Sequence, residues 1–258
     1  MVNKILFGDC RETLKTIDTK ARMCVTSPPY YGLRNYGGED KQIGMEQTPE
    51  EYIEQLVDVF RSVRDVLTDD GTLWLNIGDT YYNYRSDGNY PKQTVSRTKQ
   101  DLPDFSPVRG NKLHNLKSKD LIGIPWMLAF ALRADGWWLR QDIIWNKPNP
   151  MPESVKDRCT KSHEYIFLLS KSKHYFYDNE AIKEPVKQDW GERDRTSGKY
   201  HNPGTGLQPH SGLTKSYDRK NKRSVWTVTN KPYKGAHFAC FPPDLIEPCI
   251  LAGSREGD

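Results

Sequence analysis

The apolar residues of the first part of the chain form two short runs and one long helical pattern. Ile5 to Phe7 and Met23 to Thr26 are short runs that end in turn residues, which predicts two buried strands. Thr48-Pro49-Glu50-Glu51 has the sequence of a capping box, and apolar residues then recur at helical spacing. The turn sequence Asp69-Asp70-Gly71 separates this helix from a further apolar run, Thr72 to Ile77. This part of the chain is therefore predicted to alternate strand, helix, strand.

The alternation continues through the rest of the chain. Asp120 to Ala134 has an apolar face at helical spacing, and Trp138 to Trp145 and Tyr165 to Leu169 have the composition of strands. Asp244 to Leu251 suggests a last helix. Alternating elements of this kind predict an α/β fold with a largely parallel sheet and helices on both faces. Ligands of such sheets bind at the carboxyl ends of the strands, so candidate chemistry is sought there.

Composition narrows the classes of protein that fit. The chain has 258 residues, of which 36% are hydrophobic, enough to build a substantial core. No run of eighteen apolar residues and no signal peptide is found, so we expect no membrane association and a cytoplasmic location. The five cysteines are scattered without a CxxC pair, which favours a reducing compartment and gives no spacing typical of a metal site.

The charge is distributed unevenly. Residues 83–119 carry eight Lys/Arg against three Asp/Glu, and residues 183–234 carry twelve against five. The net charge of the whole chain is +4, so the rest of the chain is acidic. Both basic segments are long, rich in polar residues and without apolar periodicity, as expected of loops that contact phosphates. Ordinary solvated loops are the alternative that charge alone leaves open.

The strongest chemical motif is Thr26-Ser27-Pro28-Pro29-Tyr30, which follows a predicted strand directly. Two prolines fix the backbone here, so the Ser27 hydroxyl and the Pro28 carbonyl can both accept hydrogen bonds from one amino group. The exocyclic amine of cytosine or adenine is a poor nucleophile because its lone pair is delocalised. Two acceptors on its hydrogens favour the tetrahedral form that attacks a methyl group, while Tyr30 offers a stacking face for a flipped base. A simple Pro-Pro turn at the end of a strand is the alternative.

This motif resembles that of the DNA amino-methyltransferases, in the serine form associated with cytosine N4 rather than adenine N6. Further blocks of the chain resemble that family in the same order: Gly8-Asp9-Cys10, Leu67 to Trp74, Gly136 to Arg140, Trp145 to Pro150, Lys156-Asp157-Arg158, His163-Glu164-Tyr165 and Gly235 to Pro242. The catalytic loop precedes the recognition region, which is the order of the β subgroup. The resemblance covers nearly the whole chain and implies an S-adenosylmethionine-dependent, Rossmann-like sheet with inserted basic loops.

The resemblance also implies roles for individual residues. Asp9 and Thr26 would lie near S-adenosylmethionine, and Phe238, Phe241 and Pro242 would pack around its methionine end. A Gly-Asp turn at Asp9 and a helix entry with core aromatics at Phe238 to Pro242 are the alternatives. A target-base pocket would include Trp145, Asn146 and Lys147, although Trp145 fits a core position equally well.

Residues 183–234 occupy the position of the family's target-recognition region. Their basic side chains suit contacts with the phosphates or guanines of double-stranded DNA, and the candidates are Arg193, Arg195, Arg219, Lys220, Lys222 and Arg223. The predicted organisation is thus a catalytic α/β portion over 1–182, with a basic loop at 83–119, a recognition region over 183–234, and the start of a cofactor-binding half over 235–258.

One expected motif of the family is missing from the sequence. The Gly-rich loop that cradles the cofactor would follow residues 251–258, and no Phe-x-Gly-x-Gly occurs elsewhere. A truncated chain, a split enzyme completed by a second polypeptide, and a binding protein descended from the enzyme all explain this. In the first two cases we expect little cofactor binding by these residues alone.

The leading hypothesis is a site-specific DNA methyltransferase that acts on cytosine N4 in a restriction-modification system. Methylation of adenine N6 is the alternative within the same class, since the serine form of the motif is a tendency. A catalytically silent DNA-binding subunit is the alternative from another class, favoured by the missing loop. A general nucleotide-binding α/β protein is disfavoured by the absence of any phosphate-binding loop.

Overall fold

The protein is described from a computed structural model, which places the chain except for residues 1–3, 34–41, 83–114, 187–217, 232 and 234–239. Contacts divide the chain into two compact units. The larger unit comprises Met1–Tyr177 with Ser224–Asp258, and the smaller comprises Asp178–Arg223. The motif that resembles a catalytic loop lies in the larger unit.

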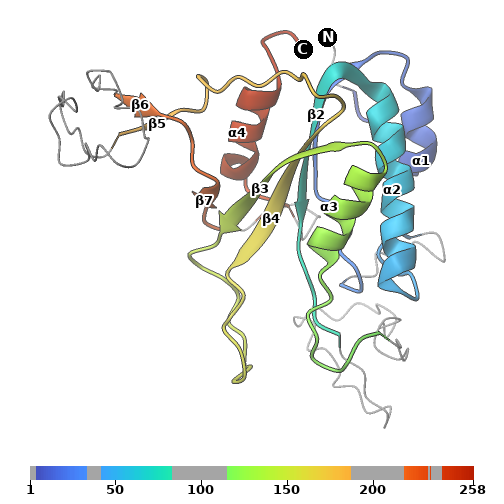
Figure 1. The fold of residues 1–258 in the computed structure, drawn as a ribbon, viewed down its shortest axis with the longest axis vertical. Coiled ribbons are helices and arrows are strands. Elements are labelled where there is room, and N and C mark those ends of the chain that lie inside the picture. The colour runs from blue at the N-terminus through green and yellow to red at the C-terminus, as the bar shows by residue number, and fades with distance from the viewer. Residues whose placement is uncertain (1–3, 34–41, 83–114, 187–217, 232, 234–239) are drawn as a thin grey trace, which may run out of the picture. The chain divides into compact units, whose positions relative to one another are not determined.

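A five-stranded sheet forms the centre of the larger unit (Figure 1). In spatial order its strands are β1 (Ala21–Thr26), β2 (Leu67–Ile77), β4 (His163–Ser170), β3 (Trp138–Asn146) and β7 (Val225–Thr227). The β1–β2 and β3–β7 pairs are parallel, and β4 is antiparallel to both of its neighbours. Four strands therefore run in one direction and only β4 is reversed. This confirms the α/β class and the largely parallel sheet predicted from the sequence.

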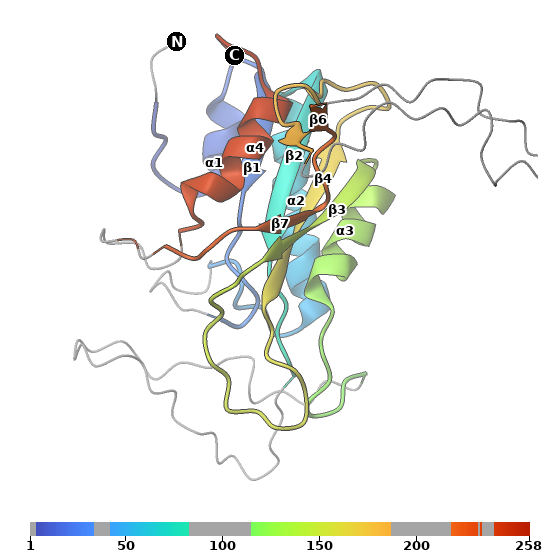
Figure 2. The same cartoon turned by 90° about the vertical axis from the view of Figure 1, so that its left-hand side faces the viewer.

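Helices cover both faces of this sheet, as Figures 1 and 2 show. On one face lie α2 (Pro49–Val66) and α3 (Ile124–Ala134), which enclose the main hydrophobic core. The other face is covered by α4 (Pro243–Gly253). The short helix α1 (Cys10–Thr13) and the 3-10 turn η1 (Leu14–Thr16) contact α2.

Helix α2 begins with the capping box expected from the sequence. The Thr48 hydroxyl accepts a bond from the Glu51 backbone N–H at 3.1 Å, and the Glu51 carboxylate accepts one from the Thr48 N–H at 3.2 Å. These bonds satisfy amides that have no partner within the first turn. The apolar face of the helix then buries Tyr52, Leu56 and Phe60 against the sheet. The capped end of α2 lies next to the proline-rich loop after β1, so it helps to position that loop.

Strand β2 is longer than predicted because it includes Asp69-Asp70-Gly71. Its register against β1 jumps in this stretch, since Ala21 pairs with Leu67 whereas Met23 pairs with Thr72. The turn residues therefore form an irregularity within the strand instead of separating it from α2. Arg22 donates to the Asp70 carboxylate at this point, with distances of 2.5 and 2.7 Å.

The buried strand predicted at Ile5 to Phe7 is wrong. These residues are not in a strand, and the side chains of Ile5 and Phe7 are 77% and 88% exposed. β1 pairs on one side with β2, and within the described residues no strand pairs with its other side. An apolar run forms a strand only where a neighbour accepts its backbone hydrogen bonds.

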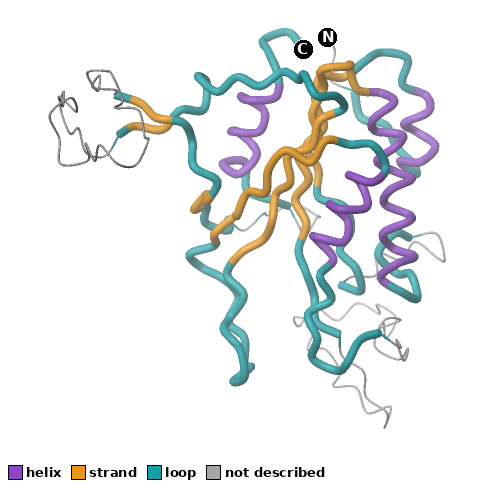
Figure 3. The backbone as a smooth tube through the Cα atoms, in the orientation of Figure 1, coloured by secondary structure: helices purple, strands orange, loops and turns teal. Residues whose placement is uncertain are grey.

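The smaller unit contains one short antiparallel pair, β5 (Glu184–Pro185) and β6 (Arg219–Lys220). Within the larger unit, β3 and β4 are joined by a long irregular loop, which extends past the strand ends in Figure 3. None of the helices in the described parts of the chain is both long and apolar enough to cross a membrane.

Candidate active site

The loop from Ser27 to Tyr30 begins where β1 ends, at the carboxyl end of the parallel pair β1–β2. It is anchored from the core. The Tyr52 hydroxyl, on α2, donates to the Pro29 carbonyl at 2.7 Å, and the Tyr52 side chain is fully buried. Gly44 packs against the same loop, where a Cβ would lie 3.1 Å from the Tyr30 carbonyl oxygen. The backbone of this loop is therefore held by its surroundings as well as by its two prolines.

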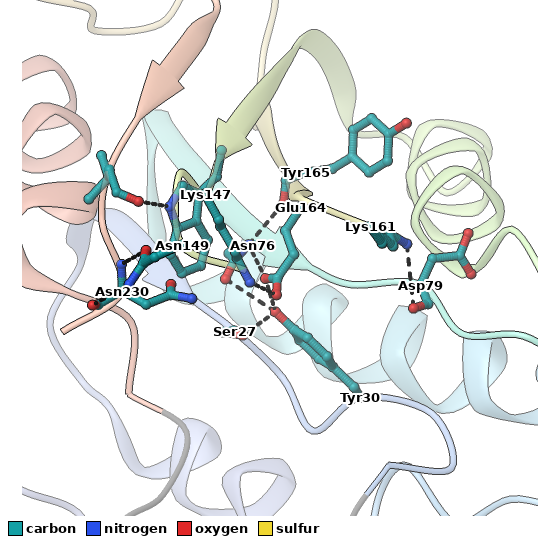
Figure 4. A network of polar contacts seen from close by, with 12 residues as sticks. Ser27, Tyr30, Asn76, Asp79, Lys147, Asn149, Lys161, Glu164, Tyr165 and Asn230 are labelled. Atoms are coloured by element: carbon teal, nitrogen blue, oxygen red, sulfur yellow. Dashed lines mark hydrogen bonds and ion pairs between the residues drawn. The ribbon is translucent and has the colours of Figure 1, made fainter. Parts of the chain in front are cut away.

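The Tyr30 side chain turns inward and meets three polar groups at the strand ends, as Figure 4 shows. Its hydroxyl lies 2.6 Å from Glu164 Oε2, 3.3 Å from Ser27 Oγ and 3.2 Å from Asn76 Oδ1. Gly78 allows this placement, because a Cβ there would lie 2.6 Å from the ring of Tyr30. The structure thus brings Ser27 and Tyr30 together, which the proposed chemistry requires.

The phenol of Tyr30 is held in its protonated form. Burial raises the pKa of Tyr30 well above its usual range, and the nearby negative charge and hydrogen bond of Glu164 raise it further. Tyr30 is therefore a hydrogen-bond donor throughout the physiological pH range.

Glu164 is the residue on which this network converges. Its carboxylate accepts from Tyr30 and from Asn76 Nδ2 at 3.2 Å, and it forms an ion pair with Lys147. The side chains of Glu164 and Lys147 are each 16% exposed. Lys147 Nζ also lies 4.1 Å from the centre of the Trp145 ring, a cation–π contact. Three donors, one of them a cation, thus surround this largely buried carboxylate, and they offset the cost of burying its charge.

Sequence reasoning missed Glu164 and Asn76 as members of the site. Asn76 is the one polar residue in the apolar run Leu73 to Ile77, and its amide donates to the Tyr165 carbonyl at 3.1 Å as well as to Glu164. The indication that the sequence offered for Asn76 was a single polar side chain near the end of an otherwise apolar, buried strand. Glu164 stands at the start of β4, and no local pattern shows that β4 is reversed, so its position at this end of the sheet was not predictable.

The predicted base-pocket residues lie along the end of β3, with different partners. Trp145 is 5% exposed, and its Nε1 donates to the Val228 carbonyl at 2.8 Å. Asn146 donates to the Thr227 hydroxyl at 3.1 Å. Of the three, Lys147 reaches the network around Tyr30. Their role in holding a base stays a prediction.

The described cofactor candidates lie in two places: Thr26, Phe241 and Pro242 toward the carboxyl end of β1, and Asp9 in the N-terminal segment. Gly253, at the end of α4, packs against Met23, in the first half of β1, and against Thr72, the partner of Met23 on β2. The opposite end of α4, with half-buried Phe241 and buried Pro242, therefore lies toward the carboxyl end of β1, where Thr26 is located. The predicted contact of Phe241 and Pro242 with the cofactor needs an apolar wall beside the loop from Ser27 to Tyr30, and that contact stays a prediction.

Asp9 has a local role in the structure. It is the N-cap of α1, where its carboxylate accepts from the Arg11 N–H at 2.9 Å and pairs with the Arg11 guanidinium at 2.5 Å. Asp9 thus lies in the Gly-Asp turn that was the alternative considered for it, at the entry to α1, and its contact with the cofactor stays a prediction. Phe238 lies outside the described residues, so its contact with the cofactor stays a prediction.

Two of the basic residues predicted to contact DNA, Lys220 and Arg223, lie against the acidic Glu184. Arg223 pairs with Glu184 at 2.5 Å, and Lys220 Nζ lies 3.9 Å from the same carboxylate. Arg219 donates to the Lys183 carbonyl at 2.8 Å. The hydrogen bond from Arg223 lowers the pKa of Glu184, so this carboxylate stays ionised. The side chain of Lys222 is half-buried. Arg193 and Arg195 lie outside the described residues.

A second polar cluster lies beside the loop. Asp79 Oδ1 accepts from the N–H groups of Gly123 and Ile124, at 3.0 and 3.1 Å, and so caps α3. Burial lowers the pKa of Lys161, whose Nζ lies 3.4 Å from the Asp79 carbonyl. A small cavity of about 60 Å³ lies next to these groups, lined by Tyr30, Tyr31, Leu33, Gly78, Asp79, Thr80 and Ile124. Among the residues that the structure places, no three His, Cys, Asp or Glu are grouped to hold a metal ion.

Comparison with known proteins assigns this arrangement to a family. Residues 21–258 match the family model described as DNA methylase, of the N6/N4 methyltransferases. The chain belongs to this family. It is 48% identical over 255 residues to the Type II methyltransferase M.SmaI of Serratia marcescens, spanning 98% of this chain and 76% of that protein. It is 46% identical to the Type II methyltransferase M.Cfr9I of Citrobacter freundii, spanning 97% of this chain and 72% of that protein.

A solved DNA methylase shares the fold. The PvuII DNA methyltransferase, described as cytosine-N4-specific, superimposes with a TM-score of 0.58 at 16% identity, covering 96% of this chain and 69% of that one. DNA methylases of this family use S-adenosylmethionine, so the family and the cofactor expected from the sequence are confirmed. The motif Ser27 to Tyr30 thus lies within the matched residues of a methylase.

Proposed function

We propose that this DNA methylase transfers a methyl group from S-adenosylmethionine to cytosine N4 at a specific site in double-stranded DNA, as part of a restriction-modification system. The observation that carries the proposal is the position of Ser27. Its hydroxyl lies at the carboxyl end of β1, 3.3 Å from the hydroxyl of Tyr30, on a loop fixed by Tyr52. A rigid acceptor at that position is what an exocyclic amine needs from the protein.

The residues of the chain act on the base and not on the methyl group. When bound, S-adenosylmethionine would supply a methyl group on a positively charged sulfur; the amine nitrogen would form the new bond as the sulfur–carbon bond breaks. One proton of the amine would then pass to solvent water, leaving the methylated base and the neutral thioether. Ser27 accepts a hydrogen bond from the amine and so favours the tetrahedral nitrogen whose lone pair attacks. Phe241, Pro242 and Thr26 are the residues of this chain that would lie beside the donor.

The choice of cytosine rests on Ser27 itself. The motif has serine where adenine N6 enzymes of this family commonly have aspartate, and a hydroxyl is a weaker acceptor than a carboxylate. Adenine N6 methylation is therefore the outcome that would correct the proposal. The relatives named as Type II methyltransferases support a role in restriction-modification. The cytoplasmic location and the second polypeptide expected from the sequence stay predictions.

The test is the identity of the modified base. Plasmid DNA from cells that express the full-length protein is digested to nucleosides and compared with N4-methylcytosine and N6-methyladenine standards. Ser27→Ala is the negative control, and Ser62→Ala, a serine on α2 whose hydroxyl bonds only within the helix, is the matched positive control. N4-methylcytosine that depends on Ser27 supports the proposal. N6-methyladenine would correct the base, and no modified base would overturn the activity.

A further inference from the structure

The direction of the hydrogen bonds around Tyr30 is set by Glu164. An ionised carboxylate can only accept, so the Tyr30 hydroxyl, 2.6 Å away, must donate its single hydrogen to it. The Tyr30 oxygen is then left as an acceptor. Ser27 Oγ, at 3.3 Å, is placed to donate its own hydrogen to that oxygen.

Asn76 cannot reverse this direction. Its Nδ2 donates to both Glu164 and the Tyr165 carbonyl, at 3.2 and 3.1 Å, which fixes the orientation of the amide. Its Oδ1 lies 3.2 Å from the Tyr30 oxygen and competes as an acceptor with Glu164. The shorter, charge-assisted bond to the carboxylate is the stronger of the two. Asn76 thus holds the Glu164 carboxylate in position. The direction of donation, from Ser27 to Tyr30 and from Tyr30 to Glu164, is unchanged.

This order has a consequence at Ser27. A hydroxyl has one hydrogen and two lone pairs, so a serine that donates to Tyr30 keeps both lone pairs for other groups. The amino group of a base donates its hydrogens, so only a hydrogen-bond acceptor on the protein can hold it in place. If the bonds ran the other way, one Ser27 lone pair would accept from Tyr30 and the Ser27 hydrogen would be free to point at the amine, which would weaken acceptance of the amine hydrogens.

We propose that Glu164 is a positioning residue for methyl transfer, which acts through Tyr30 to keep the Ser27 hydroxyl an acceptor toward the target amine. The inference rests on the proposed function, because it assigns this role within the same site. It does not depend on whether the amine belongs to cytosine or adenine.

Lys147 completes the arrangement. The Lys147 ammonium pairs with the Glu164 carboxylate, and both side chains are only 16% exposed. Lys147, Tyr30 and Asn76 all present hydrogens to this carboxylate, so every neighbour treats Glu164 as an acceptor. Lys147 is itself packed on the Trp145 ring, which keeps the cation in place.

The experiment compares Glu164→Gln in two backgrounds of the full-length protein. A neutral amide at residue 164 can donate or accept, so it no longer sets the direction of the hydrogen bonds. We expect single-turnover methyl transfer to fall about 10- to 100-fold, with the dissociation constant for DNA unchanged within about twofold. In a Tyr30→Phe background the same substitution should cost less than about threefold, because the link to Ser27 is already absent.

Two companion variants separate positioning from folding. Glu164→Gln combined with Lys147→Met removes the cation that the first change leaves unpaired, so this pair should fold well and still transfer slowly. Glu153→Gln is the matched control, since Glu153 is a half-buried carboxylate paired with Arg158 in the β3–β4 loop. It should transfer at the rate of the unmodified protein.

The outcomes are distinct. Equal losses for Glu164→Gln in both backgrounds would overturn the positioning role, and so would a rate loss matched by loss of DNA binding or of folded protein. An unmodified protein that methylates while Glu164→Gln keeps its full rate would overturn this inference and leave the proposed function intact. An unmodified protein that methylates no DNA would instead overturn the proposed function.

Discussion

Gly78 faces Tyr30 so closely that a Cβ on Gly78 would lie 2.6 Å from Cε2 of the tyrosine ring. Gly78 follows the last residue of β2, so its backbone cannot move away without disturbing the sheet. We therefore expect Gly78→Ala to displace the ring and break the bond from Tyr30 to Glu164. Methyl transfer should fall about tenfold or more, and the free energy of unfolding by about 1–3 kcal/mol. Single-turnover rates and urea denaturation measure the two effects.

The control for this prediction is Gly253→Ala on the opposite face of the sheet. A Cβ there would meet Met23 Sδ and Thr72 Oγ1, both at 3.1 Å, so this change is also crowded. It should destabilise the fold while the rate per folded molecule stays unchanged. A similar rate loss in both variants would show that general packing strain, and not displacement of Tyr30, slows transfer.

The bond from Tyr52 to the Pro29 carbonyl predicts a second effect. Tyr52→Phe removes the 2.7 Å hydrogen bond and leaves the carbonyl without that donor. The expected loss of unfolding free energy is about 1–3 kcal/mol, since a buried acceptor loses its partner. Tyr31→Phe is the matched control, because its hydroxyl lies at a longer distance, 3.4 Å, from the Gln47 carbonyl. Comparable losses in the two variants, measured by urea denaturation, would contradict a special role for the Pro29 bond.

Removing the Asp79 side chain is expected to destabilise the protein by uncapping α3. Its Oδ1 accepts from the first amides of that helix, Gly123 and Ile124, and glycine has no side chain to cap them. Asp79→Ala should lower the free energy of unfolding by about 1–2 kcal/mol. Asp58→Ala, which removes an exposed carboxylate paired with Arg61 on α2, should change it by less than about 0.5 kcal/mol. Equal effects in urea denaturation would show that Asp79 is not an effective cap.

Cys24 predicts a dependence of stability on pH. Burial raises the pKa of the Cys24 thiol from an ordinary value of 9.0 to about 11. Between these values the folded protein keeps a proton that the unfolded chain has lost. Stability contributed by this group is therefore fully present below about pH 9 and is lost as the pH rises toward 11. In Cys24→Ala this part of the alkaline decline should be absent, and iodoacetamide at about pH 8.5 should label exposed Cys159 well before Cys24.

From the basic residues of the smaller unit we predict how the affinity for DNA depends on salt concentration. Replacing Arg219, Lys220 and Lys222 by Gln should weaken DNA binding and reduce the slope of log K against log salt by about one for each phosphate that is no longer neutralised. Lys173→Gln, an exposed lysine of the larger unit, is the control and should leave the slope unchanged. Fluorescence anisotropy over a salt series measures this, and an unaltered slope in the triple variant would show that these residues do not neutralise phosphates.

Local patterns were sufficient for the three long helices, α2, α3 and α4, and for the position of the loop from Ser27 to Tyr30. The capping box at Thr48 and the proline-rich turn after β1 depend on neighbours in sequence, and both were predicted from those neighbours. The failed strand at Ile5 to Phe7 shows the limit, because a strand needs a partner whose position the run itself does not encode.

The site was predictable only in part for the same reason. Ser27 and Tyr30 share one motif, whereas Glu164 reaches them from a reversed strand more than a hundred residues away. Asn76 joins them from a third strand. The contact between these residues depends on the order and direction of the strands, which are properties of the whole sheet. No local pattern in the sequence indicates that order or direction.

The anchoring of Pro29 by Tyr52 also determines which molecule must move when DNA is engaged. Tyr52 belongs to the central core, and such regions open only when most of the protein unfolds. The backbone of the loop from Ser27 to Tyr30 is therefore expected to be fully formed before any encounter. The rearrangement that delivers an amine to it then falls on the nucleotide, whose release from the stacked duplex costs a few kcal/mol. Mismatched or weakly stacked target nucleotides should accordingly be captured faster than paired ones.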